Sequence, residues 1–217
     1  MPLSVDQTGR DKEEISRFRN EHLGEEDVVK DGRVLGIMVS RAFGDCQWKR
    51  PLELQQDVKQ RFYGPAPLTP KYDIQTPPYM TAEPVVISTK VNPSKPSFLI
   101  MATDGMLDML SNQRAVYLVG KWLESQAAER RHRKPEPTNE PFDFGHFWKG
   151  LSWKFEDGRK TIQDDNAAVH LVRNSLGGNH HELIVGRLAF SFPQSRRLRD
   201  DMTLQVVFFN TPGLKRR

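Results

Sequence analysis

The chain has a single cysteine, Cys46, among its 217 residues. One cysteine excludes an internal disulfide framework and is consistent with a reducing compartment. No apolar run approaches the roughly 20 residues that a membrane-spanning helix requires. Acidic residues begin at Asp6, so the first ten residues match neither a secretory signal peptide nor a transit peptide. We therefore expect no membrane span and no targeting segment within this chain.

A strong excess of charge of one sign is also lacking. Lys and Arg total 32 against 28 for Asp and Glu, a formal net charge of +4, and the basic residues are scattered rather than gathered on one face. This balance permits contact with an anionic partner without requiring nucleic acid. Because no module combines basic and aromatic residues, nucleic-acid binding is not predicted.

The pattern of apolar and turn residues predicts short helices mixed with hairpin-linked strands. Asp31-Gly32 between two apolar runs is a strong signal for a two-residue hairpin. Helices are expected over residues 11–22, 52–62, 111–124, 165–177 and 181–188, and strands over 33–39, 84–91, 97–103 and 203–209. This mixture predicts an α+β fold with antiparallel sheets.

Two parts of this pattern affect how the chain is organised. Residues 97–103 read SFLIMAT, and such a nearly continuous apolar run indicates a strand buried on both faces. Residues 125–160 are charged and contain prolines, which predicts a polar insert. A length of 217 residues fits one domain, so we expect a single domain over residues 1–217 interrupted by that insert.

Aspartates lie where two of the apolar strands meet turns. Asp104 directly follows SFLIMAT, and Asp200 and Asp201 precede the last strand. Carboxylates at strand ends suit hard divalent cations such as Mg²⁺ and Mn²⁺. From spacing alone, turn residues that bond their own backbone are the favoured explanation, because Asp is common in turns.

Three short motifs resemble those of the PPM, or protein phosphatase 2C, family. They are SRAFGD at 40–45, ATDGMLD at 102–108 and RDDMT at 199–203. Further segments are similar to the branch that contains pyruvate dehydrogenase phosphatase: LSVDQTG at 3–9, EEISRFRNEHLGEEDVVKDGRVLG at 13–36 and DNAAVHLVRNSLGG at 165–178. Their joint order over most of the chain is what makes the resemblance specific.

The resemblance implies a metal-dependent protein serine/threonine phosphatase. Family members hold two Mg²⁺ or Mn²⁺ ions that activate a water for attack on phosphorus. The metal-activated water is therefore the expected nucleophile, and no side chain is expected to act as a catalytic residue. By position in the motifs, Asp104 and Asp200 match metal ligands, and Asp108 matches a residue that helps to hold a weaker third metal.

The same resemblance implies supporting roles for other motif residues. Asp201, Asp45 and Gly105 are expected next to the ligands, where Asp201 would orient Asp200 and Asp45 would bond backbone groups near the site. Arg41 is expected to pair with a carboxylate.

The chain departs from the family pattern in one respect. Its Asp-Gly dipeptides at 31, 104 and 157 are never followed by His-Gly, although the family's Asp-Gly-His-Gly motif supplies an aspartate that bridges both metals. The resemblance therefore implies the C-terminal part of an α-β-β-α sandwich of two antiparallel sheets flanked by helices, with the N-terminal strands missing. Open strand edges and exposed apolar faces would make such a fragment unstable or prone to aggregate.

Two functions follow as hypotheses. The first is a metal-dependent phosphatase fragment acting on a phosphoserine or phosphothreonine protein, with a dehydrogenase complex subunit as one candidate substrate and the mitochondrial matrix as its location. The alternative is a catalytically incomplete, phosphatase-like binding module or pseudo-enzyme. The absent bridging aspartate separates the two hypotheses.

Overall fold

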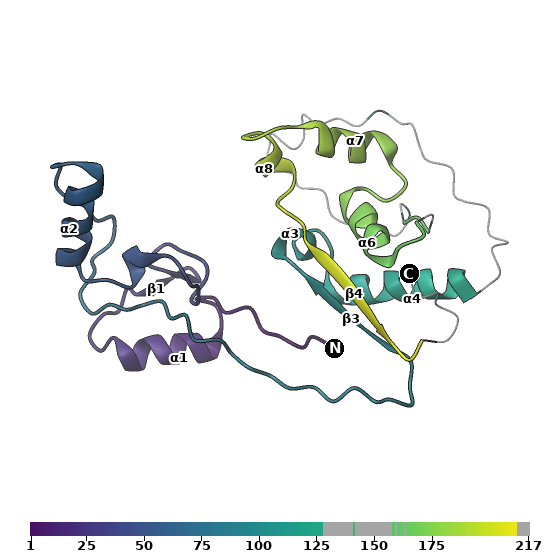
Figure 1. Cartoon of the computed structure of the whole chain (residues 1–217), viewed down its shortest axis with the longest axis horizontal. Helices are drawn as coiled ribbons and strands as arrows, with labels where there is room; N and C mark the ends of the chain where they lie inside the picture. The colour runs from purple at the N-terminus through teal and green to yellow at the C-terminus, as the bar shows by residue number, and fades with distance from the viewer. Residues whose placement is uncertain (128–140, 142–157, 159, 163, 212–217) are drawn as a thin grey trace. The chain divides into compact units, whose positions relative to one another are not determined.

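The computed structural model describes residues 1–127, 141, 158, 160–162 and 164–211. Most of the expected insert at 125–160 lies outside these described residues. The chain divides into two compact units, one covering Pro2–Thr89 and the other covering Lys90–Arg217 together with Met1. Figure 1 labels most of the elements of each unit.

The N-terminal unit begins with a capped helix and a hairpin. Helix α1 (Lys12–Glu21) starts where the Asp11 side chain accepts hydrogen bonds from the backbone N–H groups of Glu13 and Glu14. Strands β1 (Val29–Lys30) and β2 (Arg33–Val34) pair antiparallel around Asp31 and Gly32. Both turn residues have positive φ, 52° and 74°, which confirms the predicted two-residue hairpin.

The rest of this unit is largely irregular. It contains the 3-10 helix η1 (Cys46–Trp48) and helix α2 (Leu52–Tyr63), which confirms the predicted helix. The expected strand over 33–39 is shorter than predicted, ending at Val34, and no strand forms over 84–91. Val86 is 85% exposed, because no strand among the described residues pairs with this segment. The core of this unit comprises Phe18, Val28, Val34, Leu35 and Tyr79.

The C-terminal unit is built around one antiparallel strand pair. Strands β3 (Ser97–Ala102) and β4 (Leu204–Phe209) align from Ser97 opposite Phe209 to Ala102 opposite Leu204. Helices α4 (Asn112–Ala127) and α6 (Ala167–Leu176) pack against each other, and α6 also contacts β4 (Figure 1).

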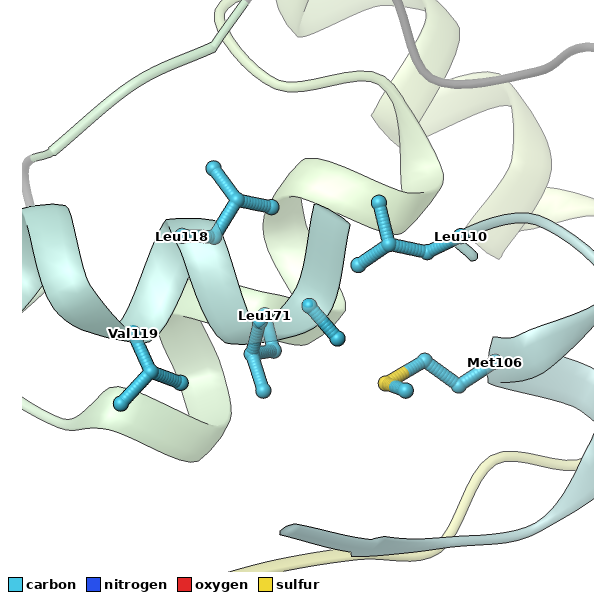
Figure 2. Close-up of a cluster of buried hydrophobic side chains, with 6 residues drawn as sticks. Met106, Leu110, Leu118, Val119 and Leu171 are labelled. Atoms are coloured by element: carbon cyan, nitrogen blue, oxygen red, sulfur yellow. The ribbon is translucent and has the colours of Figure 1, made fainter. Parts of the chain in front are cut away.

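The two faces of the β3–β4 pair differ. Alternate side chains of both strands pack on one buried cluster, part of which Figure 2 shows; the cluster is Met106, Leu110, Ala115, Leu118, Val119 and Leu171. On the opposite face, Met101 is 44% exposed and its neighbour Val207 is 37% exposed. The expectation that residues 97–103 are buried on both faces is therefore wrong, because the described helices cover only one.

Among the described residues, this unit also contains three short helices: α3 (Asp104–Leu107), α7 (His181–Ala189) and α8 (Ser195–Leu198). Helix α6 begins at an Asn166 side chain that accepts from the N–H groups of Ala168 and Val169, and it ends at Gly177. Helices with small antiparallel sheets confirm the predicted α+β class. Within the described residues, no helix is both long and apolar enough to cross a membrane.

Candidate metal centre

Asp104 lies at the junction between a strand and a helix that is anchored in the core. It is the first residue of α3, and only Thr103 separates it from the end of β3. Two residues later, the fully buried Met106 inserts into the apolar cluster (Figure 2). The N–H of Asp108 donates to the Asp104 carbonyl at 2.8 Å, so these two aspartates are one helical turn apart, on the same side of the helix.

Asp200 reaches the same end of the strand pair from the opposite direction. Leu198, the last residue of α8, is buried against Leu183 of α7. Arg199 donates from Nε to the Arg187 carbonyl at 3.0 Å, which ties the next residue to α7 as well. The segment that leads into Asp200 is therefore held by both packing and hydrogen bonding.

Hydrogen bonds from Thr103 join the two aspartate segments. Its N–H donates to the Thr203 carbonyl at 3.0 Å. Its hydroxyl accepts from the Thr203 N–H at 3.0 Å and donates to the Asp201 carbonyl at 3.0 Å. The antiparallel register places residue 103 opposite residue 203, so Thr103 and Asp201 meet although 98 residues separate them in sequence.

Gly105 sets how closely these segments approach. It is buried, and a Cβ atom there would lie 2.5 Å from the Asp201 carbonyl oxygen and 3.2 Å from the Asp200 Cβ. No side chain fits that space, so the backbone after Asp104 packs directly against Asp200 and Asp201. The predicted place of Gly105 beside metal ligands stays a prediction; what the structure gives is this close backbone contact.

The donors at this junction suit a hard cation. Asp104 and Asp200 are exposed carboxylates, and one oxygen of Asp200, Oδ1, accepts from the Asp201 N–H at 2.8 Å. Mg²⁺ is commonly held by one or two carboxylates with waters retained, so this pair fits Mg²⁺ or Mn²⁺ in donor type. In the part of the chain that the structure describes, no group of three or more His, Cys, Asp or Glu residues is arranged to hold a metal. The metal-binding roles of Asp104, Asp200 and Asp108, and the orienting role of the Asp201 side chain, remain predictions.

Asp45 belongs to the N-terminal unit, and its predicted support of the site stays a prediction. Its backbone is left-handed, with φ 58° and ψ 47°, and its side chain makes no capping bond to η1. Its carbonyl oxygen accepts from the Trp48 N–H at 3.0 Å. The backbone of this turn, rather than its carboxylate, therefore makes the bond to η1.

Arg41 pairs with a carboxylate, as predicted, and the partner is Glu14. Its Nη2 and Nε lie 2.6 and 3.1 Å from Glu14 Oε1, while Arg17 Nη2 lies 3.0 Å from the other oxygen. Burial by itself raises the pKa of Glu14, but hydrogen bonds from Arg41 and Arg17 outweigh burial and lower the pKa from 4.5 to about 2.

Sequence reasoning missed two residues, Glu14 and Thr103. Glu14 reads as one more acidic residue at a helix start, and no local pattern marks it as buried. Thr103 is part of the ATDG motif, but its bonds to residues 201 and 203 depend on strand pairing.

Comparison with known proteins gives a consistent family. The Protein phosphatase 2C family model matches residues 1–135. A Protein phosphatase 2C homolog of Schizosaccharomyces pombe is 40% identical over 215 residues, which cover 99% of this chain and 45% of the relative. The mitochondrial [pyruvate dehydrogenase [acetyl-transferring]]-phosphatase 1 of Saccharomyces cerevisiae is 34% identical over 233 residues, covering 97% of this chain and 40% of the relative.

A human relative extends the same pattern. The mitochondrial [pyruvate dehydrogenase [acetyl-transferring]]-phosphatase 2 of Homo sapiens is 35% identical over 227 residues, covering 99% of this chain and 42% of the relative. The chain thus spans less than half the length of each of these three relatives. With the family model matching more than half of its residues, the chain belongs to the protein phosphatase 2C family.

Proposed function

We propose that this chain provides part of the metal centre of a metal-dependent protein serine/threonine phosphatase. The observation that carries the proposal is the junction of Asp104 and Asp200, where Gly105 lets the two segments pack backbone to backbone. Family membership and the donor type of both carboxylates support it.

In this proposal Asp104 and Asp200 hold Mg²⁺ or Mn²⁺, and Asp108, one helical turn after Asp104, helps to hold a weaker third ion. When bound, the metal would lower the pKa of water and neutralise the phosphoryl oxygens. The chain's own contribution is to fix two carboxylates at one end of a strand pair. Helices α3 and α8, through the buried side chains of Met106 and Leu198, keep both segments from moving apart.

We further propose that β3 and β4 belong to the family's α-β-β-α sandwich. The partly exposed face formed by Met101 and Val207 is where a second sheet would pack. In this proposal the chain is the C-terminal part of one domain that includes both compact units and the 125–160 insert, and the strands that complete the sandwich come from outside these 217 residues.

The proposed substrate is a phosphoserine or phosphothreonine protein. Two of the relatives are named as mitochondrial pyruvate dehydrogenase phosphatases, which supports a dehydrogenase complex subunit as the substrate and a mitochondrial location. The name of the Schizosaccharomyces pombe relative gives no substrate. A phosphoprotein other than a dehydrogenase subunit is therefore the alternative substrate.

A second candidate is a phosphatase-like binding module without hydrolysis. One observation favours it: among the described residues, no group of three or more metal-ligating side chains is arranged to hold a metal. Under this proposal the same carboxylates would bind metal weakly and activate no water.

The test is Mn²⁺-dependent hydrolysis of p-nitrophenyl phosphate and of a phosphoserine peptide by the purified chain. The assay is run with the chain alone and with the part of the Schizosaccharomyces pombe relative that this chain does not match. Asp104→Asn and Asp200→Asn remove a carboxylate charge while keeping side-chain size. Asp57→Asn, an exposed aspartate of α2 paired with Arg61, is the matched control.

We expect activity in the combined sample that falls by at least 100-fold in either site variant, about 3 kcal/mol of transition-state stabilisation, and that is unchanged in the control. Activity that survives both site substitutions would contradict the assignment of Asp104 and Asp200. Absence of hydrolysis by the chain, both alone and in the combined sample, with Mn²⁺ still bound, would favour the binding module.

A further inference from the structure

We propose that Thr103 is a positioning residue whose hydroxyl keeps the Asp104 and Asp200 carboxylates together for a divalent cation. This inference rests on the proposed function, because it assigns a role within the same metal centre. It adds a side chain that binds neither metal nor substrate but connects the two segments that do.

The hydrogen bonds of Thr103 differ from those of an ordinary strand ending. The β3–β4 register ends at Ala102 opposite Leu204, and the N–H of Thr103 still donates to the Thr203 carbonyl, as in a continuing ladder. The second hydrogen bond of this residue pair has a different acceptor: the Thr203 N–H donates to the Thr103 hydroxyl oxygen at 3.0 Å. A side-chain oxygen therefore receives the bond that a backbone carbonyl would take in a regular antiparallel pair.

The Thr103 hydroxyl acts as both a hydrogen-bond donor and a hydrogen-bond acceptor across this junction. Its single proton is donated to the Asp201 carbonyl at 3.0 Å, while its oxygen accepts from Thr203. Although Thr103 is the N-cap residue of α3, its side chain makes no capping bond to that helix. The hydroxyl therefore serves the contact with residues 201 and 203 rather than the helix that follows it.

This bonding connects Thr103 to both proposed ligands. Asp104 is the next residue in the chain, so the backbone of Thr103 fixes its starting position. On the other side, the backbone of Asp201 is held at both polar groups: its carbonyl accepts from Thr103, and its N–H donates to Asp200 Oδ1 at 2.8 Å. A shift of the Asp201 backbone would therefore move the carboxylate of Asp200.

A purely structural role for Thr103 makes a different prediction. If the hydroxyl only joins two loops, its loss lowers stability and leaves the affinity for metal unchanged. If it positions the ligands, its loss also lowers metal affinity, as seen when groups that orient metal ligands are removed.

The test compares three variants of the full 217-residue chain. Thr103→Val keeps the branched shape but removes the hydroxyl, and Thr103→Ser keeps the hydroxyl. Thr211→Val is the control, since it removes one hydroxyl-to-carbonyl bond, to Phe209 at 3.2 Å, beyond the far end of the same strand β4. Each variant is titrated with MnCl₂ while paramagnetic broadening of the backbone amide signals of Gly105 and Asp201 is followed by NMR. Urea denaturation of the same samples records stability separately.

We expect Thr103→Val to need about 10- to 100-fold more Mn²⁺ for half-maximal broadening, and Thr103→Ser and Thr211→Val to match the wild type. Equal Mn²⁺ midpoints for wild type and Thr103→Val would overturn the role of Thr103 and leave the metal centre intact. A Thr103→Ser variant that loses affinity would also overturn it, which keeps the test decisive should the valine variant not fold. Absence of selective broadening in the wild type would contradict the proposed metal centre itself.

Discussion

Gly105 lies where the approach of two backbone segments leaves no room for a side chain. Its φ is not in the left-handed region, so conformational freedom is not what requires glycine there. The requirement is steric, because a Cβ would lie 2.5 Å from the Asp201 carbonyl oxygen. That atom is backbone, which cannot rotate away as a flexible side chain would.

We predict that Gly105→Ala destabilises the chain by about 1–3 kcal/mol, the usual cost of overpacking a close-packed site, and weakens Mn²⁺ binding because residues 200–201 must shift. Gly120→Ala is the matched control: it lies inside α4, and a Cβ there meets nothing within 4 Å. Replacing a helical glycine by alanine should stabilise by about 0.5–1 kcal/mol.

Urea denaturation of both variants gives the two changes in the free energy of unfolding. Opposite signs for the same chemical substitution are the expected result. A neutral or stabilising Gly105→Ala would mean that the 200–201 segment is not held against residue 105.

At the scale of elements, a buried carboxylate ties α1 to the segment that follows β2. Glu14 is 1% exposed and receives Arg17 from its own helix and Arg41 from the SRAFGD motif. Arg17 also reaches Glu21 one turn further along at 2.7 Å. The two glutamates thus share one arginine but differ in burial.

We predict that Glu14→Gln destabilises the chain by roughly 2 kcal/mol, because hydrogen bonds to charged groups are lost and two arginines keep their charge in a partly buried setting. Glu21→Gln should cost less than about 0.5 kcal/mol, since that side chain is half exposed and its ion pair is screened by water. Equal effects of the two substitutions in chemical denaturation would contradict the central role of Glu14.

The same carboxylate predicts a pH dependence. The folded-state pKa of Glu14, about 2, lies below the ordinary value of 4.5, so the unfolded chain binds more protons between these values. The stabilisation is complete above about pH 4.5 and is lost as the pH falls towards 2. Unfolding free energies measured from pH 6 to pH 2 should fall less steeply for Glu14→Gln than for wild type, and parallel curves would refute this assignment.

At the scale of the whole molecule, the β3–β4 pair presents a partly apolar face that no described helix covers. Met101 and Val207 contribute to it, and Met101 lies opposite Gln205 in the register. Exposed apolar surface on a two-stranded sheet whose outer edges are unpaired among the described residues favours self-association. We therefore expect the isolated chain to self-associate increasingly as its concentration is raised.

Met101→Lys should weaken that association at least tenfold, since burying a methionine is worth about 1.5–3 kcal/mol and about 1.4 kcal/mol corresponds to tenfold. Gln205→Lys adds the same charge beside it without removing apolar surface, and its effect should be smaller. Sedimentation velocity over a concentration series measures both. A wild-type chain that stays monomeric throughout would argue against an open apolar face.

Local signals account for the elements that were predicted correctly. Asp11 and Asn166 cap helices through bonds to residues two and three positions ahead, and Asp31-Gly32 forms its turn without distant partners. The strand expected over 84–91 does not form, because a strand depends on a partner rather than on local signals. Its apolar residues fit a strand, but a strand forms only with a partner, and none of the described residues pairs with it.

For the candidate site, the sequence alone identifies which residues can bind metal but not how they meet. The motifs single out Asp104 and Asp200 because each follows or precedes an apolar strand and because the family resemblance assigns them a role. Their junction depends on the antiparallel register, on the hydroxyl of Thr103 and on the absence of a side chain at Gly105. Those contacts join residues nearly one hundred positions apart, and only tertiary packing brings such distant segments together, because no local propensity acts over that separation.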